Sequence, residues 1–185
     1  MFNLRLGAGL LAVALAITVT MTVRPAVAAS RAEINRDVDA ALAILYAKDP
    51  DARTLTRQAK AVLVFPGIVK AGFLFGAQYG EGALRAKGKT VGYYNTVAAS
   101  YGLQAGVQVF GYALFFMTDS ALQYLAKSDG FELGVGPSIV VLDTGAAKAL
   151  TTTTAQKDMY AIFFNQKGLM AGLGLQGSKI SRIDK

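Results

Sequence analysis

The sequence predicts an α+β fold: a glycine-rich, strongly curved antiparallel β-sheet, sandwich-like or barrel-like, with amino-terminal helices and one internal helix. Three observations support this class. Residues 71–80 and 101–110 alternate large and small side chains with the two-residue period of a strand. Glycines occupy much of one face of these segments. Residues 31–47, and again the residues after 120, repeat apolar side chains at helical spacing.

The predicted helices have recognisable start signals. Ser30 and Glu33 have the spacing of a capping box, which predicts a helix over residues 31–47. Asp49 followed by Pro50 is typical of an N-cap and a first-turn proline, so a short second helix is expected over residues 51–60. The polar residues 118–120 can cap an internal helix that ends before Gly130.

The strands are placed by alternation and by turn residues. Residues 60–82 predict two strands joined by a turn at Pro66 and Gly67. Residues 83–98 predict a hairpin with its turn at residues 87–89. Further strands are expected over residues 101–110, 131–142, 150–154, 159–165 and 169–176. The glycine-rich face either permits strong curvature and close packing or lines a groove for an acyl chain.

The first 28 residues resemble an export signal. Arg5 precedes an apolar run over residues 6–19, and residues 26–28 have the Ala-x-Ala form that signal peptidase prefers. We therefore expect a signal peptide over residues 1–28 and a single mature domain over residues 29–185. A retained membrane anchor is the alternative, although threonines, Arg24 and Pro25 shorten the run below a span of about 20 apolar residues.

Composition limits the chemistry. The chain has no cysteine and no histidine, so disulfides, thiol catalysis and the usual proton shuttle are absent, and no cofactor or metal is expected. Residues 172–177 fit Gly-x-Gly-x-x-Gly, but no strand-to-helix context or later acidic residue accompanies them. Removal of residues 1–28 deletes two arginines and no acid, which leaves 17 basic and 12 acidic residues, a net charge of +5. A basic exported protein favours anionic partners such as phospholipid headgroups; nucleic acid is not expected.

Several blocks, in order, resemble the SYLF domain family. They are residues 59–66, 70–73, 80–82, 102–108, 134–137 and 167–177, so the resemblance spans roughly residues 33–184. Two segments depart from the pattern. Residues 92–95 stand where the family usually has Trp-Ser-x-Pro, and residues 162–166 replace a stretch rich in tyrosine and serine.

This resemblance implies a non-catalytic module that binds phospholipids, with phosphoinositides as the ligands of eukaryotic members. Some eukaryotic members also bind actin, which we do not expect of an exported protein. The expected location is periplasmic or secreted, peripherally associated with a membrane. The candidate headgroup contacts are basic residues near predicted turns: Lys70, Lys87, Lys89 and Lys167, with Arg85 as a weaker fifth.

Two other classes stay open. A structural or protein-interaction module of the cell envelope would bind a protein partner, and its sign would be an exposed apolar patch. An enzyme would need a buried cluster of carboxylates, since its serines have no histidine to activate them.

Overall fold

The computed structural model describes residues 28–127, 130–132, 135–142, 157–168 and 177–185, and it confirms the α+β class. Two helices, α1 (Arg31–Lys48) and α2 (Pro50–Gln58), precede a long strand pair, and α3 (Asp119–Lys127) follows it. The pair consists of β1 (Ala61–Ala86) and β2 (Lys89–Phe116). The remaining described strands are β3 (Phe131–Glu132), β4 (Ile139–Leu142), β5 (Met159–Gly168) and β6 (Lys179–Ile183).

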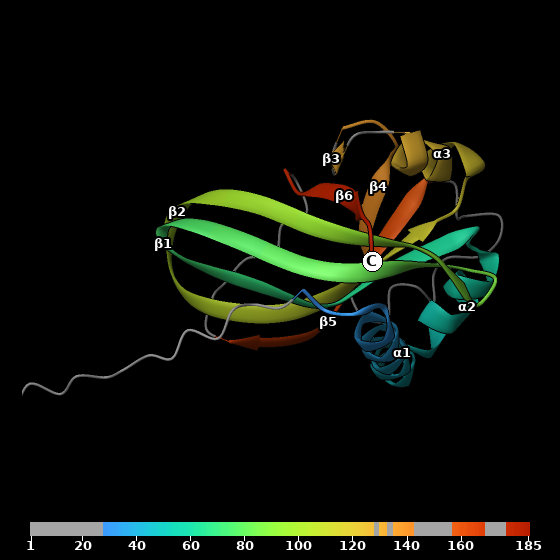
Figure 1. Ribbon diagram of the computed structural model, residues 1–185, viewed down its shortest axis with the longest axis horizontal. Coiled ribbons are helices and arrows are strands. Elements are labelled where there is room, and N and C mark those ends of the chain that lie inside the picture. The colour runs from blue at the N-terminus through green and yellow to red at the C-terminus, as the bar shows by residue number, and fades with distance from the viewer. Residues whose placement is uncertain (1–27, 128–129, 133–134, 143–156, 169–176) are drawn as a thin grey trace, which may run out of the picture.

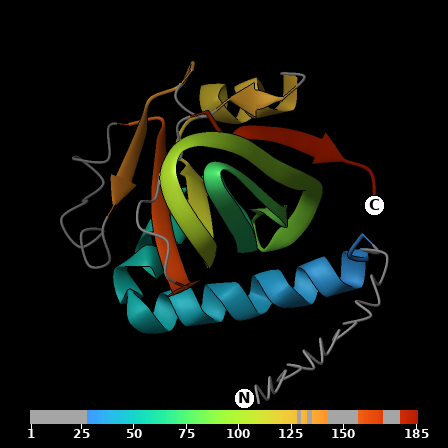
Figure 2. The same cartoon turned by 90° about the vertical axis from the view of Figure 1, so that its left-hand side faces the viewer.

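The ribbon formed by β1 and β2 dominates the fold (Figure 1). The two strands pair antiparallel along their whole length, from Ala61 opposite Phe116 to Ala86 opposite Lys89. Midway the ribbon bends and returns over itself, so that an end-on view shows a curled half-barrel with β1 inside β2 (Figure 2). This curl is the strong curvature that the glycine pattern predicted.

Glycines make the return possible. A Cβ atom at Gly80 would lie 2.6 Å from Cγ1 of Ile68 and 3.0 Å from the carbonyl oxygen of Gly67, on the other half of the same strand. A Cβ atom at Gly82 would overlap the carbonyl oxygen of Val64. Only hydrogen fits where one backbone packs directly on another.

The expected turn at Pro66 and Gly67 is wrong. The strand continues through both residues, and the pairing register shifts between Phe65 and Ile68. Proline cannot donate a ladder hydrogen bond, and a bulge accommodates it without ending the strand. The chain reversal predicted at residues 87–89 is confirmed, with Lys87 at φ 49° and Gly88 at φ 76°.

The rest of the sheet assembles on the outer strand of the ribbon. β2 pairs antiparallel with β6 over residues 93–97 and with β5 over residues 108–116, while β4 joins β5 in parallel. The predicted strand over residues 131–142 is instead β3 and β4, and β6 was not predicted. The expected strands over residues 150–154 and 169–176 lie outside the described residues.

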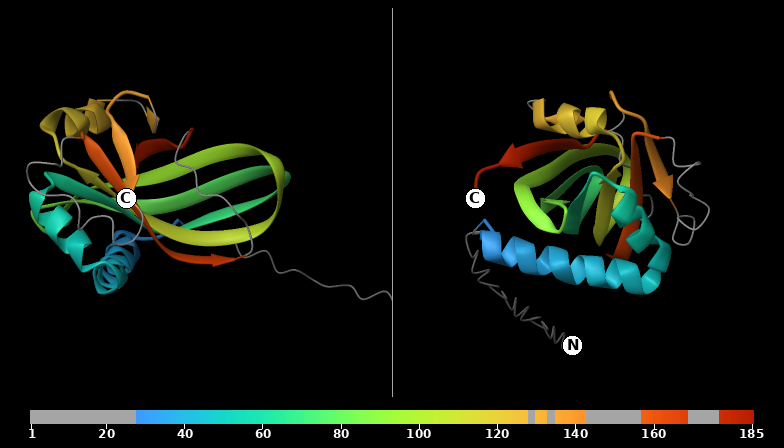
Figure 3. Two further views of the ribbon diagram at one scale, coloured as in Figure 1. Left: turned by 180° about the vertical axis from the view of Figure 1, so that it is seen from behind. Right: turned by 90° about the vertical axis from the view of Figure 1, so that its right-hand side faces the viewer.

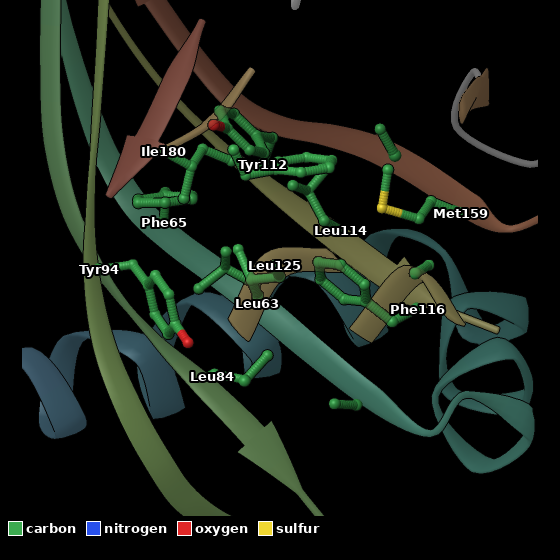
Figure 4. Close-up of a cluster of buried hydrophobic side chains, with 14 of the residues drawn as sticks. Leu63, Phe65, Leu84, Tyr94, Tyr112, Leu114, Phe116, Leu125, Met159 and Ile180 are labelled. Atoms are coloured by element: carbon green, nitrogen blue, oxygen red, sulfur yellow. The ribbon is translucent and has the colours of Figure 1, made fainter. Parts of the chain in front are cut away.

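The sheet buries side chains on both faces. One face, with Val62 and Val64, packs against buried residues of α1 and α2 such as Val38 and Leu55. The other face forms an aromatic-rich core inside the curl, closed by α3 and β6 (Figures 3 and 4). The members labelled in Figure 4 are Leu63, Phe65, Leu84, Tyr94, Tyr112, Leu114, Phe116, Leu125, Met159 and Ile180.

The helix starts follow the predicted chemistry. The Ser30 hydroxyl accepts from the backbone N–H of Glu33 at 3.3 Å, and the Glu33 carboxylate accepts from the Ser30 N–H at 2.8 Å. This second hydrogen bond lowers the pKa of Glu33. The side chain of Asp49 caps α2. Among the described residues, none of the helices has the length and apolar character that crossing a membrane requires. The division at residue 28 stays a prediction.

Candidate functional site

Basic side chains gather where the β1–β2 turn meets α1 and α2. A cavity of about 440 Å³ lies there, lined by residues of both helices and of β1. Four cations and one acid are in its lining: Arg57, Lys60, Arg85, Lys87 and Asp39. Lys89 begins β2 directly after the turn, and its side chain is exposed. We call this region, residues 57–60 and 85–89, the basic end.

Arg85 anchors the turn to α1. Its guanidinium forms an ion pair with Asp39 at 2.6 Å and donates to the backbone carbonyl of Asn35 at 3.2 Å. The side chain of Arg85 is only 16% exposed, and its buried Nε has no hydrogen-bond partner among the described residues. The Asn35 amide oxygen also accepts from the Thr90 hydroxyl at 2.7 Å, which ties the other strand of the hairpin to α1. The turn is therefore held in place, while Lys87 at its tip is exposed.

The two other cations of the cavity come from the end of α2 and the residues after it. Arg57 donates to the Thr54 hydroxyl at 2.9 Å, and Lys60 forms an exposed ion pair with Asp119 at 3.2 Å. Exposed pairs of this kind contribute little and exchange readily with other anions. The basic character of residues 31–60 was visible in the sequence, but nothing local showed that Arg57 and Lys60 face the turn at residues 87–88.

The structure separates the five predicted contacts into two groups. Arg85, Lys87 and Lys89 lie at the basic end. Lys167 lies near the end of β5 opposite Val109 of β2, beyond the middle of the ribbon, and is exposed. Lys70 lies on β1 opposite Gln108 and is 8% exposed. In Figure 1 the end of β5 is remote from α2, so Lys167 does not belong to the basic end.

A second cavity, of about 690 Å³, lies between α1 and β1. Its lining is mainly apolar and includes Ile44, Val69 and Gly80. Glu81 also lines this cavity. Its carboxylate accepts a hydrogen bond from the Lys185 ammonium group at 2.8 Å and another from the Tyr79 hydroxyl at 2.8 Å. Burial, and then this hydrogen bond, raises the pKa of Tyr79 to about 12. Gly67 and Gly80 line the groove, whereas Gly82 packs on backbone, so only part of the glycine-rich face borders a groove.

The described residues contain no group of three or more acids that could hold a metal ion. Their one fully buried carboxylate, Asp49, serves as a helix cap.

Comparison with known families gives a match. Residues 97–185 match the family model named Ysc84 and described as Las17-binding protein actin regulator. This match is consistent with the resemblance to the SYLF domain family, a family of non-enzymatic binding domains associated with lipid-binding and actin-binding proteins. No curated protein gives a significant match to the chain.

Proposed function

We propose that the mature protein binds anionic phospholipid bilayers without chemical turnover and that the basic end contacts the headgroups. The observation that carries this proposal is the cavity at the basic end. Its lining contains four basic side chains, from three chain segments, and one acidic side chain. Phosphate-bearing headgroups match such a site because arginine and lysine both donate charge-assisted hydrogen bonds to phosphate oxygens. The similarity of residues 97–185 to a family associated with lipid binding supports the same ligand class.

The geometry of the turn supports headgroup contact. Lys87 and Lys89 are exposed at a tip that Arg85 fixes to α1, so the two ammonium groups are presented with little loss of backbone freedom. Each lysine near an anionic surface contributes about 1 kcal/mol. This attraction fades over a Debye length of about 8 Å at physiological ionic strength. Several cations must therefore act together, as the basic end allows.

Location is part of the proposal. The predicted signal peptide directs the mature chain, beginning near Ala29, to the periplasm or the outside of the cell, where it is peripherally associated with a membrane. The test is the mass of the protein recovered from the cell envelope. A retained amino terminus would contradict export with cleavage and favour a membrane anchor.

The binding test compares vesicles of phosphatidylcholine alone with vesicles that also contain phosphatidylglycerol, in a flotation assay with residues 29–185. Lys87→Glu with Lys89→Glu should weaken binding to the anionic vesicles by more than tenfold, because each reversal removes an attraction of about 1 kcal/mol and adds a repulsion. Lys127→Glu with Lys179→Glu is the matched control, since both are exposed, lie outside the basic end and change the net charge equally. Equal binding to neutral and anionic vesicles, or equal losses in both variants, would refute the headgroup role.

Lys167→Glu should have a smaller effect than the reversal at the basic end, because Lys167 stands apart from the cation cluster.

An envelope protein partner is the second candidate. The exposed apolar side chains on the ribbon favour it over a purely polar surface. Binding that ignores lipid charge and depends on those side chains would support that candidate.

A further inference from the structure

The bent end of the ribbon carries an unusual surface. We call residues 71–80 and 96–107, which pair with each other across the bend, the ribbon end. It lies at the end of the long axis opposite α2 (Figure 1). These 22 residues include no Asp, Glu, Lys or Arg, although the chain average of 17% charged residues would give about four. A solvent-exposed segment without charge is the opposite of what solubility requires.

The large side chains described as exposed at this end are apolar or aromatic, and one of them, Tyr79, also lines the cavity beside α1. Phe75 is 71% exposed, Val107 is 56% exposed and Tyr79 is 50% exposed. The pairing places Val109 opposite Val69, and Val97 opposite Tyr79, so neighbouring strands present apolar residues in adjacent positions. On the opposite face the ribbon packs on itself, as at Gly80, and Phe75, Val107 and Tyr79 lie on the exposed face.

We infer that the ribbon end inserts shallowly into the outer part of a lipid bilayer. This inference rests on the proposed bilayer binding. The ribbon end and the basic end lie at opposite ends of the long axis, so the two surfaces contact two different bilayer surfaces and not the same one. Phe75 lies nearest the bend, and Tyr79 lies four residues further along β1, about 13 Å away at strand spacing. An apolar tip followed by a tyrosine is the order found where proteins meet the membrane interface.

A basic side chain beside the ribbon end is placed where lipid phosphates would lie if the apolar tip were inserted. Lys167 is exposed on β5 opposite Val109, where an ammonium group can reach phosphates above an inserted apolar tip. The backbone of the ribbon end is paired between β1 and β2, which limits the polar groups that insertion would strip of water. Insertion to interface depth therefore costs less than for an unpaired loop.

By themselves, the large apolar side chains described at this end offer too little area for a stable contact with a second copy of the chain. Six described side chains make up the apolar surface, at about half exposure: Val69, Phe75, Tyr79, Val97, Val107 and Val109. Even if each had the roughly 200 Å² of an aromatic residue, together they would offer about 600 Å². A stable protein interface buries about 800 Å² on each partner.

The test uses the absence of tryptophan from the chain. Phe75→Trp places a single indole at the ribbon end, and Tyr124→Trp, at a 38% exposed position of α3, is the control. With vesicles containing phosphatidylglycerol and brominated acyl chains, the indole at position 75 should shift to shorter wavelength and be quenched several-fold more than that at position 124. Phe75→Asp with Val107→Asp, both at exposed positions, should keep the thermal transition and weaken vesicle binding by about tenfold.

The outcomes separate this inference from the proposed function. Vesicle binding that depends on Lys87 and Lys89 but leaves the indole at position 75 unquenched overturns insertion and retains headgroup binding. Quenching that persists in neutral vesicles and is insensitive to the reversal of Lys87 and Lys89 retains insertion and refutes the basic end. A wavelength shift that grows with protein concentration without vesicles identifies self-association and overturns insertion. Failure to bind any vesicle refutes both.

Discussion

The self-packing of the ribbon predicts a large difference between two glycines of β1. Gly82 packs on the backbone of the first half of the strand, where an added Cβ would overlap the Val64 carbonyl oxygen and lie 2.9 Å from its carbonyl carbon. Gly67 has nothing within 4 Å of such an atom, and its φ is outside the left-handed region. Gly82→Ala therefore tests the contact between the two halves of the ribbon, and Gly67→Ala is its control.

The expected magnitudes follow from the contacts. Because backbone cannot move aside like a flexible side chain, Gly82→Ala should cost at least the 1–3 kcal/mol that is typical of overpacking, or about 2–12 °C in Tm for a domain of this size. Gly67→Ala should be neutral or should stabilise by about 0.4–1 kcal/mol, because alanine restricts the unfolded chain more than glycine does. The change in the free energy of unfolding should thus be clearly unfavourable for Gly82→Ala and neutral or favourable for Gly67→Ala, although both replace glycine by alanine.

Thermal and urea unfolding followed by circular dichroism measure both variants. Equal m-values would show that the two changes act on stability and not on the compactness of the unfolded chain. A Gly82→Ala variant as stable as Gly67→Ala would mean that the halves of β1 do not touch at Val64, and the curled half-barrel would be wrong in its central feature.

Two further changes test other parts of the fold. Gly106 has open space around it but φ +134°, so Gly106→Val should cost about 1–3 kcal/mol through backbone strain and not through overpacking, and urea unfolding of Gly106→Ala should show a loss of similar size. The Asp158 carboxylate accepts from the backbone N–H and hydroxyl of Ser138 and from the Thr118 hydroxyl, and the Ser138 N–H is the main cause of its lowered pKa. Because a lowered folded-state pKa gives stability that is present above the unfolded value and lost as pH falls through the folded value, Asp158→Asn should cost about 1 kcal/mol at neutral pH and flatten the acid decline measured by urea unfolding between about pH 5 and pH 2. An unchanged acid decline in Asp158→Asn would contradict this assignment.

Local signals in the sequence predicted the local features. The helix over residues 31–47 was observed over residues 31–48, because Ser30 and Glu33 satisfy the same N–H groups that their spacing predicts. The turn at Lys87 and Gly88 and the helix after residue 118 were likewise predicted from residues adjacent to them. Each of these depends on partners within a few positions of the chain.

Contacts between distant segments were not predictable in this way. Arg85 pairs with Asp39 across 46 positions, and Lys185 reaches Glu81 across 104, so no window of the sequence contains both partners. The cation cluster depends on the first of these contacts. For this reason the sequence identified Arg85, Lys87 and Lys89 as candidates but neither linked them to Arg57 and Lys60 nor separated them from Lys167.

Alternation along the ribbon defined two faces, but it could not decide which face is buried. A bulky row containing Phe75 and Tyr79 would ordinarily be assigned to the core, and a row of glycines to the outside or to a groove. In this fold the ribbon packs on itself, and only the glycine row permits backbone contact at that distance, so the bulky row must face outward at the bend. Because Val107 is 56% exposed, its side chain contributes little to the free energy of folding. Val107→Thr should therefore leave stability within about 0.5 kcal/mol of the wild type. Folding therefore does not require an apolar exterior at the ribbon end, and its chemistry there has to be explained by what the surface contacts.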